Sequence, residues 1–215
     1  MTDFEHQRAR MVERQLRRRG IADERVLAAM GEVPREAFVP ERARRRAYHD
    51  GALPIGAEQT ISQPWIVAAI CQGLELSGDE LALEVGTGSG YSAAVLAGLA
   101  REVVSVERFA ELATRARTTL AELGFANVEV RVGDGSLGAP DRAPFGAIAV
   151  HAAAPAAPAT LLGQLEPGGR LVVPISGRGA DMLTALRATE AGIEERVIAP
   201  SRFVPLIGDE GFRER

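Results

Sequence analysis

The stretch Leu81–Tyr91, LALEVGTGSGY, contains the pattern that decides the fold. It opens with an apolar run typical of a buried strand, and the helix-forming run SAAVLAGLA follows it directly. Between the two stand three glycines at alternating positions, Gly86, Gly88 and Gly90. A second apolar run then ends on Glu107. This arrangement indicates a nucleotide-binding turn between a strand and a helix, with a carboxylate at the next strand end to accept ribose hydroxyls.

The spacing of the glycines discriminates between nucleotides. A dinucleotide-binding turn reads G-x-G-x-x-G, whereas here the third glycine comes one residue early and Tyr91 takes the place of the last one. Glu84 precedes the first glycine, where a carboxylate would repel a pyrophosphate but suit the cationic amino-acid end of S-adenosylmethionine. The pattern E-x-G-x-G-x-G resembles motif I of the class I methyltransferases. A third apolar run, 128–132, followed by Asp134 and Gly135, favours this interpretation over a dehydrogenase or a glycine-rich turn without a ligand.

Composition limits the class of protein and its partners. The 215 residues are 46% hydrophobic and carry a net charge of −4, which suits one domain with a sizeable core and disfavours nucleic-acid binding. No apolar run reaches the length of a membrane span, and we expect neither a signal peptide nor a membrane partner. A single cysteine, Cys71, excludes an intramolecular disulfide and fits a cytoplasmic location. Arginines cluster at 8–19 and 42–46, which we interpret as solvated helix faces, with a polyanion-binding patch as the alternative.

The N-terminal third predicts three helices and one irregular loop. Residues 3–19 have the apolar spacing of an amphipathic helix that a glycine ends, and Asp23 is placed to cap a second helix through residue 30. The segment 50–63 carries glycine, proline and polar residues without a helical period, so we expect it to be irregular. A proline suited to the first position of a helix begins the segment 64–76.

Beyond residue 80, short apolar runs alternate with helix-forming segments. The expected strands are 81–85, 102–107, 128–132, 145–150 and 170–175, with helices at 90–99, 108–123 and 158–164 and an antiparallel end at 181–188 and 193–199. This alternation predicts a doubly wound, mostly parallel α/β sheet whose ligands bind beyond the carboxyl ends of the strands. We expect one domain, with 1–77 forming a helical cap and an active-site loop and 78–215 forming the cofactor-binding core.

Motifs spread over nearly the whole chain resemble one family, protein-L-isoaspartate O-methyltransferase. They are VPREAFVP (33–40), ALPIG and QTISQP (within 52–64), LEVGTGSGYSAAVLA (83–97), VGDG (132–135), APFGAI (143–148), AAAP (152–155), QLEPGGRLVVPI (164–175) and RFVPL (202–206). The TISQP loop and the RFVPL tail are far more specific than the glycine turn, which many unrelated methyltransferases share.

The resemblance implies a Rossmann-like methyltransferase that repairs proteins. Such an enzyme moves a methyl group from S-adenosylmethionine to the free α-carboxyl of an isoaspartyl residue and releases S-adenosylhomocysteine. The ester closes to a succinimide, which partly reopens to normal aspartate. The implied partners are isoaspartyl peptides and proteins, and we expect a monomer.

The residue inventory agrees with this chemistry. A carboxylate acceptor with a pKa near 4 is already ionised at neutral pH, so it needs no general base, and alignment and exclusion of water remain for the protein. The sequence shows no Ser-His-Asp set and no metal-ligand cluster, and its three histidines, His6, His49 and His151, stand in unlike contexts.

The site residues follow partly from the pattern and partly from the resemblance. The resemblance makes Ser62 the active-site serine, whose hydroxyl would orient the acceptor carboxylate; capping the helix at 64 is its alternative role. Glu107 would accept from the ribose hydroxyls and Asp134 from the adenine amino group, unless either is a plain surface acid. The remaining expected cofactor contacts are Gln59, Thr60, Ile61, Glu84, Gly86, Gly88, Arg108 and Gly135. The expected substrate contacts are Ser62, Val204, Pro205 and Leu206, the last three having edge packing as an alternative role.

Three positions depart from the family pattern. Glu58 stands where glycine is common, Gly146 where an aspartate is usual, and His151 where a threonine is usual. They motivate a second hypothesis, a diverged methyltransferase that acts on another carboxylate or on a small molecule. A third hypothesis is a non-enzymatic domain that binds the cofactor or an isoaspartyl chain without turnover. The intact TISQP loop and glycine turn argue against it.

Overall fold

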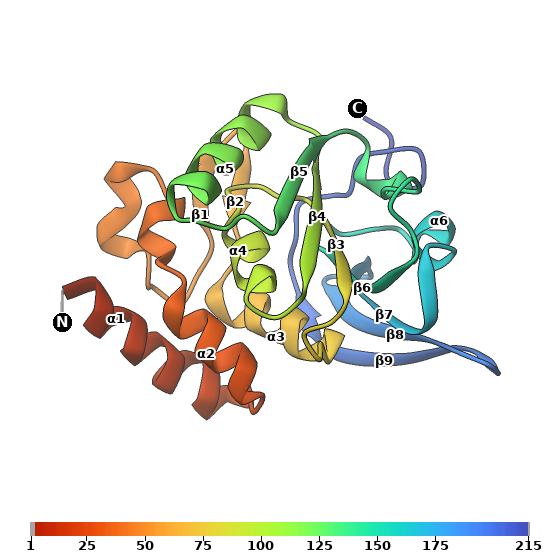
Figure 1. Cartoon of the computed structure of the whole chain (residues 1–215), viewed down its shortest axis with the longest axis horizontal. Helices are drawn as coiled ribbons and strands as arrows, with labels where there is room; N and C mark the ends of the chain where they lie inside the picture. Colours follow the sequence, from red (N-terminus) through yellow and green to blue (C-terminus); the bar gives the residue numbers. More distant parts are fainter. Residues whose placement is uncertain (1–2, 215) are drawn as a thin grey trace.

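A seven-stranded sheet forms the centre of the molecule (Figure 1). The computed structural model describes residues 3–214. In spatial order the strands are β5 (Val128–Val132), β4 (Glu102–Glu107), β3 (Leu81–Val85), β6 (Phe145–Val150), β7 (Leu165–Ser176), β8 (Asp181–Thr189) and β9 (Gly192–Ser201). The first five run parallel to one another, β8 pairs antiparallel with β7, and β9 pairs antiparallel with β8. The prediction of a doubly wound, mostly parallel sheet with an antiparallel end is confirmed.

Alternate residues of each central strand enter different hydrophobic clusters on the two faces of the sheet. In β3, Ala82 packs on one face and Leu83 on the other, as the two-residue period of a strand requires. One face is covered by α3 (Pro64–Leu74), α4 (Tyr91–Ala97) and α5 (Ala110–Glu122). The short helix α6 (Ala159–Leu162) lies on the opposite side of the sheet (Figure 1).

The N-terminal helices join the first of these clusters. Residues 3–19 are helical throughout, as α1 (Asp3–Met11), a π-helical turn η1 (Val12–Leu16) and a 3-10 turn η2 (Arg17–Arg19). The carboxylate of Asp23 accepts from the N–H groups of Arg25 and Val26 and caps α2 (Glu24–Glu32), as predicted. Two 3-10 turns follow, η3 (Arg35–Phe38) and η4 (Glu41–Arg46).

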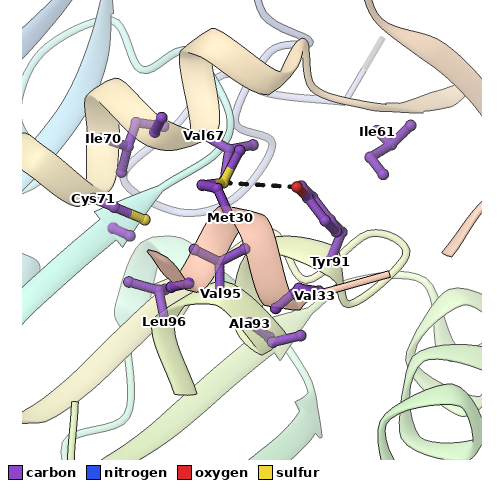
Figure 2. Packing of buried hydrophobic residues seen from close by; sticks show 14 of the residues in the cluster. Met30, Val33, Ile61, Val67, Ile70, Cys71, Tyr91, Ala93, Val95 and Leu96 are labelled. Carbon is purple, nitrogen blue, oxygen red and sulfur yellow. Dashed lines mark hydrogen bonds between the residues drawn. The ribbon is translucent and has the colours of Figure 1, made fainter. Parts of the chain in front are cut away.

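Figure 2 shows how closely the N-terminal segment and the core pack together. Met30 of α2 lies between α3 and α4, and the hydroxyl of Tyr91 donates to its sulfur over 3.6 Å. Cys71 is fully buried in the same cluster. The division at residue 77 into a cap and a core therefore cuts through one continuous hydrophobic cluster, and it stays a prediction.

Besides shifts of one to three residues at other element ends, four features differ from the sequence prediction. The segment expected to be irregular, 50–63, contains a hairpin of β1 (Leu53–Gly56) and β2 (Gln59–Ile61). Strand β7 begins at residue 165 rather than 170, helix α6 is shorter than predicted, and a 3-10 turn η5 (Gly135–Leu137) follows β5. The hairpin was missed because its strands are very short and its turn contains Ala57 and Glu58 at positive φ, where turn patterns normally carry glycine.

The third glycine of the turn is required for packing as well as for conformation. Gly90 has a φ of +90°, and a Cβ there would lie 3.2 Å from the Cβ of Ala116 on α5. Gly124 has a similar φ of +81° but faces open space, with nothing within 4 Å. The two positions share the conformational requirement and differ only in the room for a side chain.

We therefore expect Gly90→Ala to destabilise the protein more than Gly124→Ala. The left-handed conformation costs an alanine about 1–2 kcal/mol at either position. Crowding against α5 adds a further ~1 kcal/mol or more at residue 90. Urea unfolding of both variants measures the difference. Equal losses would contradict the packing argument.

Candidate active site

A cleft of about 780 Å³ opens at the carboxyl ends of β3, β4 and β6. This is the edge of the sheet where the strand order changes direction on either side of β3, the position where open α/β sheets bind ligands. Its wall is formed by the glycine turn, the hairpin loop and the C-terminal tail. The predicted site residues in this wall are Gln59, Thr60, Ile61, Ser62, Gly86, Gly88, Glu107, Arg108, Gly135, Val204, Pro205 and Leu206.

Glu107 holds the glycine turn and faces the cleft at the same time. Gly86 and Gly88 have positive φ values of 92° and 55°, which brings backbone rather than side chains to the cleft surface. One carboxylate oxygen of Glu107 accepts the N–H of Gly88 over 2.8 Å, and the other accepts the N–H of Phe109 over 2.9 Å. Each oxygen keeps a further lone pair, so the carboxylate can also accept from a vicinal diol such as ribose.

The loop after the hairpin brings Ser62 to the opposite wall. Its carbonyl oxygen accepts from a guanidinium nitrogen of Arg35 over 2.7 Å, which fixes the backbone. Its hydroxyl has no hydrogen-bond partner among residues 3–214. No side chain caps α3, whose N-cap residue is Gln63. The hydroxyl of Ser62 is therefore available to a ligand, and the alternative of a helix cap is not what the structure shows.

The C-terminal tail closes a third side of the cleft. The N–H of Ala153 donates to the carbonyl of Val204 over 2.8 Å, and the N–H of Leu206 donates to the carbonyl of Ala153 over 2.7 Å. These bonds attach the tail to the segment that follows β6. Val204, Pro205 and Leu206 line the cleft together with Ile207, which the sequence did not indicate.

The structure does not bring Asp134 into the cleft wall. One of its carboxylate oxygens accepts from the N–H and the hydroxyl of Ser136, and the other accepts the N–H of Asp209 over 2.8 Å. Burial raises the pKa of Asp134, but the hydrogen bonds from Asp209 and Ser136 outweigh it and lower the pKa overall. These bonds join the tail to the end of β5, and the expected contact of Asp134 with an adenine amino group stays a prediction. The neighbouring Gly135 does line the cleft.

Glu84 is likewise not in the cleft wall. Its side chain is fully buried under the glycine turn and accepts from the hydroxyl of Ser105, which also bonds Thr87. Burial raises the pKa of Glu84 to about 8, so the carboxyl group is mostly protonated at neutral pH. The expected contact of Glu84 with the cationic end of the cofactor stays a prediction. The position of its side chain indicates a structural role.

A serine, a histidine and a glutamate meet beside the cleft, although the sequence shows no such set. The ring nitrogen Nε2 of His151 lies 2.7 Å from the hydroxyl oxygen of Ser92 and 3.5 Å from a carboxyl oxygen of Glu84. Both contacts are made by the same ring nitrogen, whereas a nucleophilic relay requires the serine and the acid on opposite ones. Burial lowers the pKa of His151 to about 4, so the ring is neutral at pH 7. The arrangement is a buried polar network and not a hydrolytic triad.

Arg108 lies at the rim of the cleft. Its guanidinium makes a 2.6 Å ion pair with Glu214 and stacks over the ring of Phe109 at 4.9 Å. The exposure of both partners makes the ion pair weak. The cleft lining therefore contains both the guanidinium of Arg108, which a ligand can reach, and the apolar ring of Phe109.

Two of the three departures from the family pattern lie outside the cleft. Glu58 is exposed at the tip of the hairpin, with a φ of +57° that explains why a glycine suits this position. Gly146 interrupts the pairing of β6 with β7, and a Cβ there would lie 2.8 Å from the side chain of Glu80. Neither residue lines the cleft. Only His151 lines the cleft.

Several further cleft residues were not assigned a role from the sequence. They are Val67, Val85, Thr87, Ser89, Tyr91, Ser92, Val106, Phe109, His151, Ala152 and Ile207. Tyr91 and Ser92 begin the helix after the glycine turn, so their distance from the last glycine was a usable signal. Thr87 and Ser89 lie inside the glycine turn and could have been expected in the same way, whereas Val67 reaches the cleft only through the packing of a separate segment.

Comparison with known proteins agrees with this geometry. The family model for protein-L-isoaspartate(D-aspartate) O-methyltransferase matches residues 6–211. The chain is 53% identical over 216 residues to protein-L-isoaspartate O-methyltransferase 1 of Rhodopseudomonas palustris (strain HaA2), covering 98% of this chain and 87% of the relative. It is 53% identical over 212 residues to the enzyme of the same name from Syntrophobacter fumaroxidans (strain DSM 10017 / MPOB), covering 99% of each.

Solved structures show the same architecture. A protein-L-isoaspartate O-methyltransferase superposes with a TM-score of 0.83 at 27% identity, over 96% of this chain and 67% of that one. A Plasmodium falciparum protein solved in complex with S-adenosyl-L-homocysteine superposes with a TM-score of 0.81 at 24% identity, over 93% of this chain and 98% of that one. The second comparison supports the fold alone.

The fold and the cleft together define a class I methyltransferase, which uses S-adenosylmethionine. Within that class, the chain belongs to the protein-L-isoaspartate(D-aspartate) O-methyltransferase family. The resemblance noted in the sequence is thereby confirmed.

The neutral state of His151 predicts a loss of stability in acid. The unfolded chain takes up the histidine proton near pH 6.5, whereas the folded chain resists it until about pH 4. Protonation of this ring between these values favours the unfolded state, so the contribution of His151 to stability is complete above pH 6.5 and is lost as the pH drops. The raised pKa of Glu84 acts in the opposite direction. We expect His151→Asn to remove about 2–3 kcal/mol of the loss between pH 7 and pH 4.5, measured by urea unfolding.

The matched control is His49→Asn, because His49 is exposed. This variant should lose stability in acid in parallel with the unmodified protein. If His151→Asn also did so, the buried ring would not be the group responsible.

Proposed function

We propose that this protein transfers the methyl group of S-adenosylmethionine to the free α-carboxyl of L-isoaspartyl residues in damaged proteins. The observation that carries the proposal is that one cleft has a wall suited to the cofactor and another wall suited to an acceptor carboxylate. The glycine turn with Glu107 forms one wall. Ser62, whose hydroxyl has no hydrogen-bond partner among the described residues 3–214, forms the other. Membership of the family supports the choice of acceptor.

The cleft residues fit the cofactor. Glycine backbone at the surface admits close approach, and the carboxylate of Glu107 retains acceptor capacity for a diol. The apolar ring of Phe109 and the backbone at Gly135 border the same space. When bound, S-adenosylmethionine supplies an electrophilic methyl group on a positively charged sulfur.

The protein's own contribution is orientation and exclusion of water. An α-carboxyl group is ionised at neutral pH and carries the lone pair that attacks, so no residue has to remove a proton. We infer that the hydroxyl of Ser62 donates to one acceptor oxygen and leaves the other free to align with the methyl group. The hairpin loop and the tail residues Val204–Leu206 would hold the acceptor peptide and keep bulk water out of the cleft.

The expected partners are isoaspartyl segments of other proteins. We further infer a monomer that acts in the cytoplasm, which is consistent with a lone, buried cysteine. Within residues 3–214, no helix is long and apolar enough to cross a membrane.

One experiment tests the acceptor directly. Labelled S-adenosylmethionine is supplied with two peptides of identical sequence, one isoaspartyl and one aspartyl, and base-labile methyl ester is counted. We expect label in the isoaspartyl peptide alone. Absence of label from both, with cofactor binding confirmed by calorimetry, would refute the repair activity. The diverged methyltransferase would then lead, and His151 is the departure in the cleft that would motivate a search for other acceptors.

A second prediction concerns Ser62. Ser62→Ala removes one hydrogen bond to a charged group, worth about 1.5–3 kcal/mol. We expect kcat for the isoaspartyl peptide to fall roughly 10- to 100-fold, while the Kd for S-adenosylhomocysteine changes by less than about threefold. The control is Ser201→Ala. The hydroxyl of Ser201 donates to the carbonyl of Asp181 away from the cleft, so this variant should keep the normal kcat. An equal loss of cofactor affinity in Ser62→Ala would show that Ser62 is mainly structural.

A further inference from the structure

Arg35 is a fully buried cation that no carboxylate neutralises. Its side chain has 0% exposure. Its Nε donates to the carbonyl of Ala47 over 2.7 Å and its Nη2 to the carbonyl of Ser62 over 2.7 Å, both uncharged acceptors. Its Nη1 is buried without a hydrogen-bond partner. No carboxylate of residues 3–214 forms an ion pair with it.

A buried charge without a counterion is costly, so its retention calls for a reason. Burial lowers the pKa of Arg35, but a guanidinium remains charged at neutral pH. Buried arginines are normally paired with a carboxylate, because an unpaired charge loses its hydration without compensation. The partners of this cation among the described residues are the carbonyls of Ala47 and Ser62 and the side chain of Tyr91, none of which is a carboxylate.

Two of the three contacts of Arg35, those with Ser62 and Tyr91, lead to the cleft. Arg35 donates to the carbonyl of Ser62, the residue whose hydroxyl is proposed to bind the acceptor. Its guanidinium also lies 4.7 Å from the ring centre of Tyr91. Ser62 and Tyr91 both line the cleft. A single positive charge thus stands directly behind the wall against which the acceptor is expected to bind.

We propose that Arg35 is a positioning residue that fixes the Ser62 loop and supplies the positive charge that selects an anionic acceptor. The inference rests on the proposed function and deepens it, because it states why a free carboxylate is preferred over a neutral group of the same shape. The incoming α-carboxylate provides the counterion that the protein lacks. At an effective dielectric constant of about 20, opposite charges up to about 12 Å apart change a dissociation constant by about tenfold or more.

The test compares two peptides that differ only in charge. One carries the isoaspartyl α-carboxylate, and the other carries the corresponding α-carboxamide, which cannot accept a methyl group. Calorimetry in the presence of S-adenosylhomocysteine gives the Kd of each. We expect the unmodified protein to prefer the carboxylate at least tenfold, and the preference to persist from about 50 to 500 mM salt, since a buried charge is poorly screened.

Three variants separate charge from structure. Arg35→Gln should reduce the preference to within about threefold while the Kd for S-adenosylhomocysteine changes little, and Arg35→Lys should keep most of the preference. The matched control is Arg25→Gln. Arg25 also donates to backbone carbonyls, those of Leu76 and Leu99, but it has no contact with the cleft, so this variant should keep the full preference.

Each result bears on the proposal. Equal weakening of both peptides by Arg35→Gln would show a structural role alone and overturn it, as would an unmodified protein without a preference. If Arg35→Gln does not fold, the other measurements decide: loss of the preference in Arg35→Lys, or its removal by salt, also overturns the proposal. Methylation of the isoaspartyl peptide by the unmodified protein, measured in parallel, shows whether the function itself has failed or only the role of Arg35.

Discussion

Three glycines at positive φ carry the chain from β3 into α4, and the carboxylate of Glu107 holds this turn by accepting the N–H of Gly88. The rest of the cleft depends on this contact. Because the turn is made of backbone alone, the end of β6 can pass close to it: a Cβ on Gly86 would lie 3.5 Å from the Cβ of His151. The same strand end anchors the tail through Ala153, so the turn indirectly places three walls of the site.

The buried titratable side chains beside the cleft differ in whether burial removes their charge. Under the turn, burial drives Glu84 and His151 toward their uncharged forms, as expected for titratable groups that can lose their charge. Behind Ser62, Arg35 cannot lose its charge and is stabilised only by carbonyl groups and an aromatic ring. The cleft therefore has a neutral floor and a positively charged wall. This asymmetry suits a reaction in which an anion meets a cationic methyl donor.

The antiparallel hairpin β1–β2 and the C-terminal tail supply parts of the cleft wall that the central sheet does not. Gln59, Thr60 and Ile61 follow the hairpin turn, and Val204–Leu206 face the same space from the opposite end of the sequence. Neither segment belongs to the central sheet. The sheet supplies a general cofactor cleft, and these two additions restrict what can reach it.

The sequence alone determined the central architecture and the cofactor class. Strands 81–85, 102–107, 128–132 and 145–150 were predicted with their observed bounds. The central ones are largely apolar because both of their faces are buried, whereas the edge strand 128–132 alternates apolar and charged residues. The glycine spacing and Glu107 were readable because they are local consequences of one turn. Only the tertiary structure decided the roles of Asp134, Glu84 and Arg35. Their partners come from distant segments, such as Asp209, 75 residues from Asp134, and Ser62, 27 residues from Arg35. A side chain's chemistry is visible in the sequence, but whether it is buried, and what it meets there, is set by packing between segments that the local pattern does not relate.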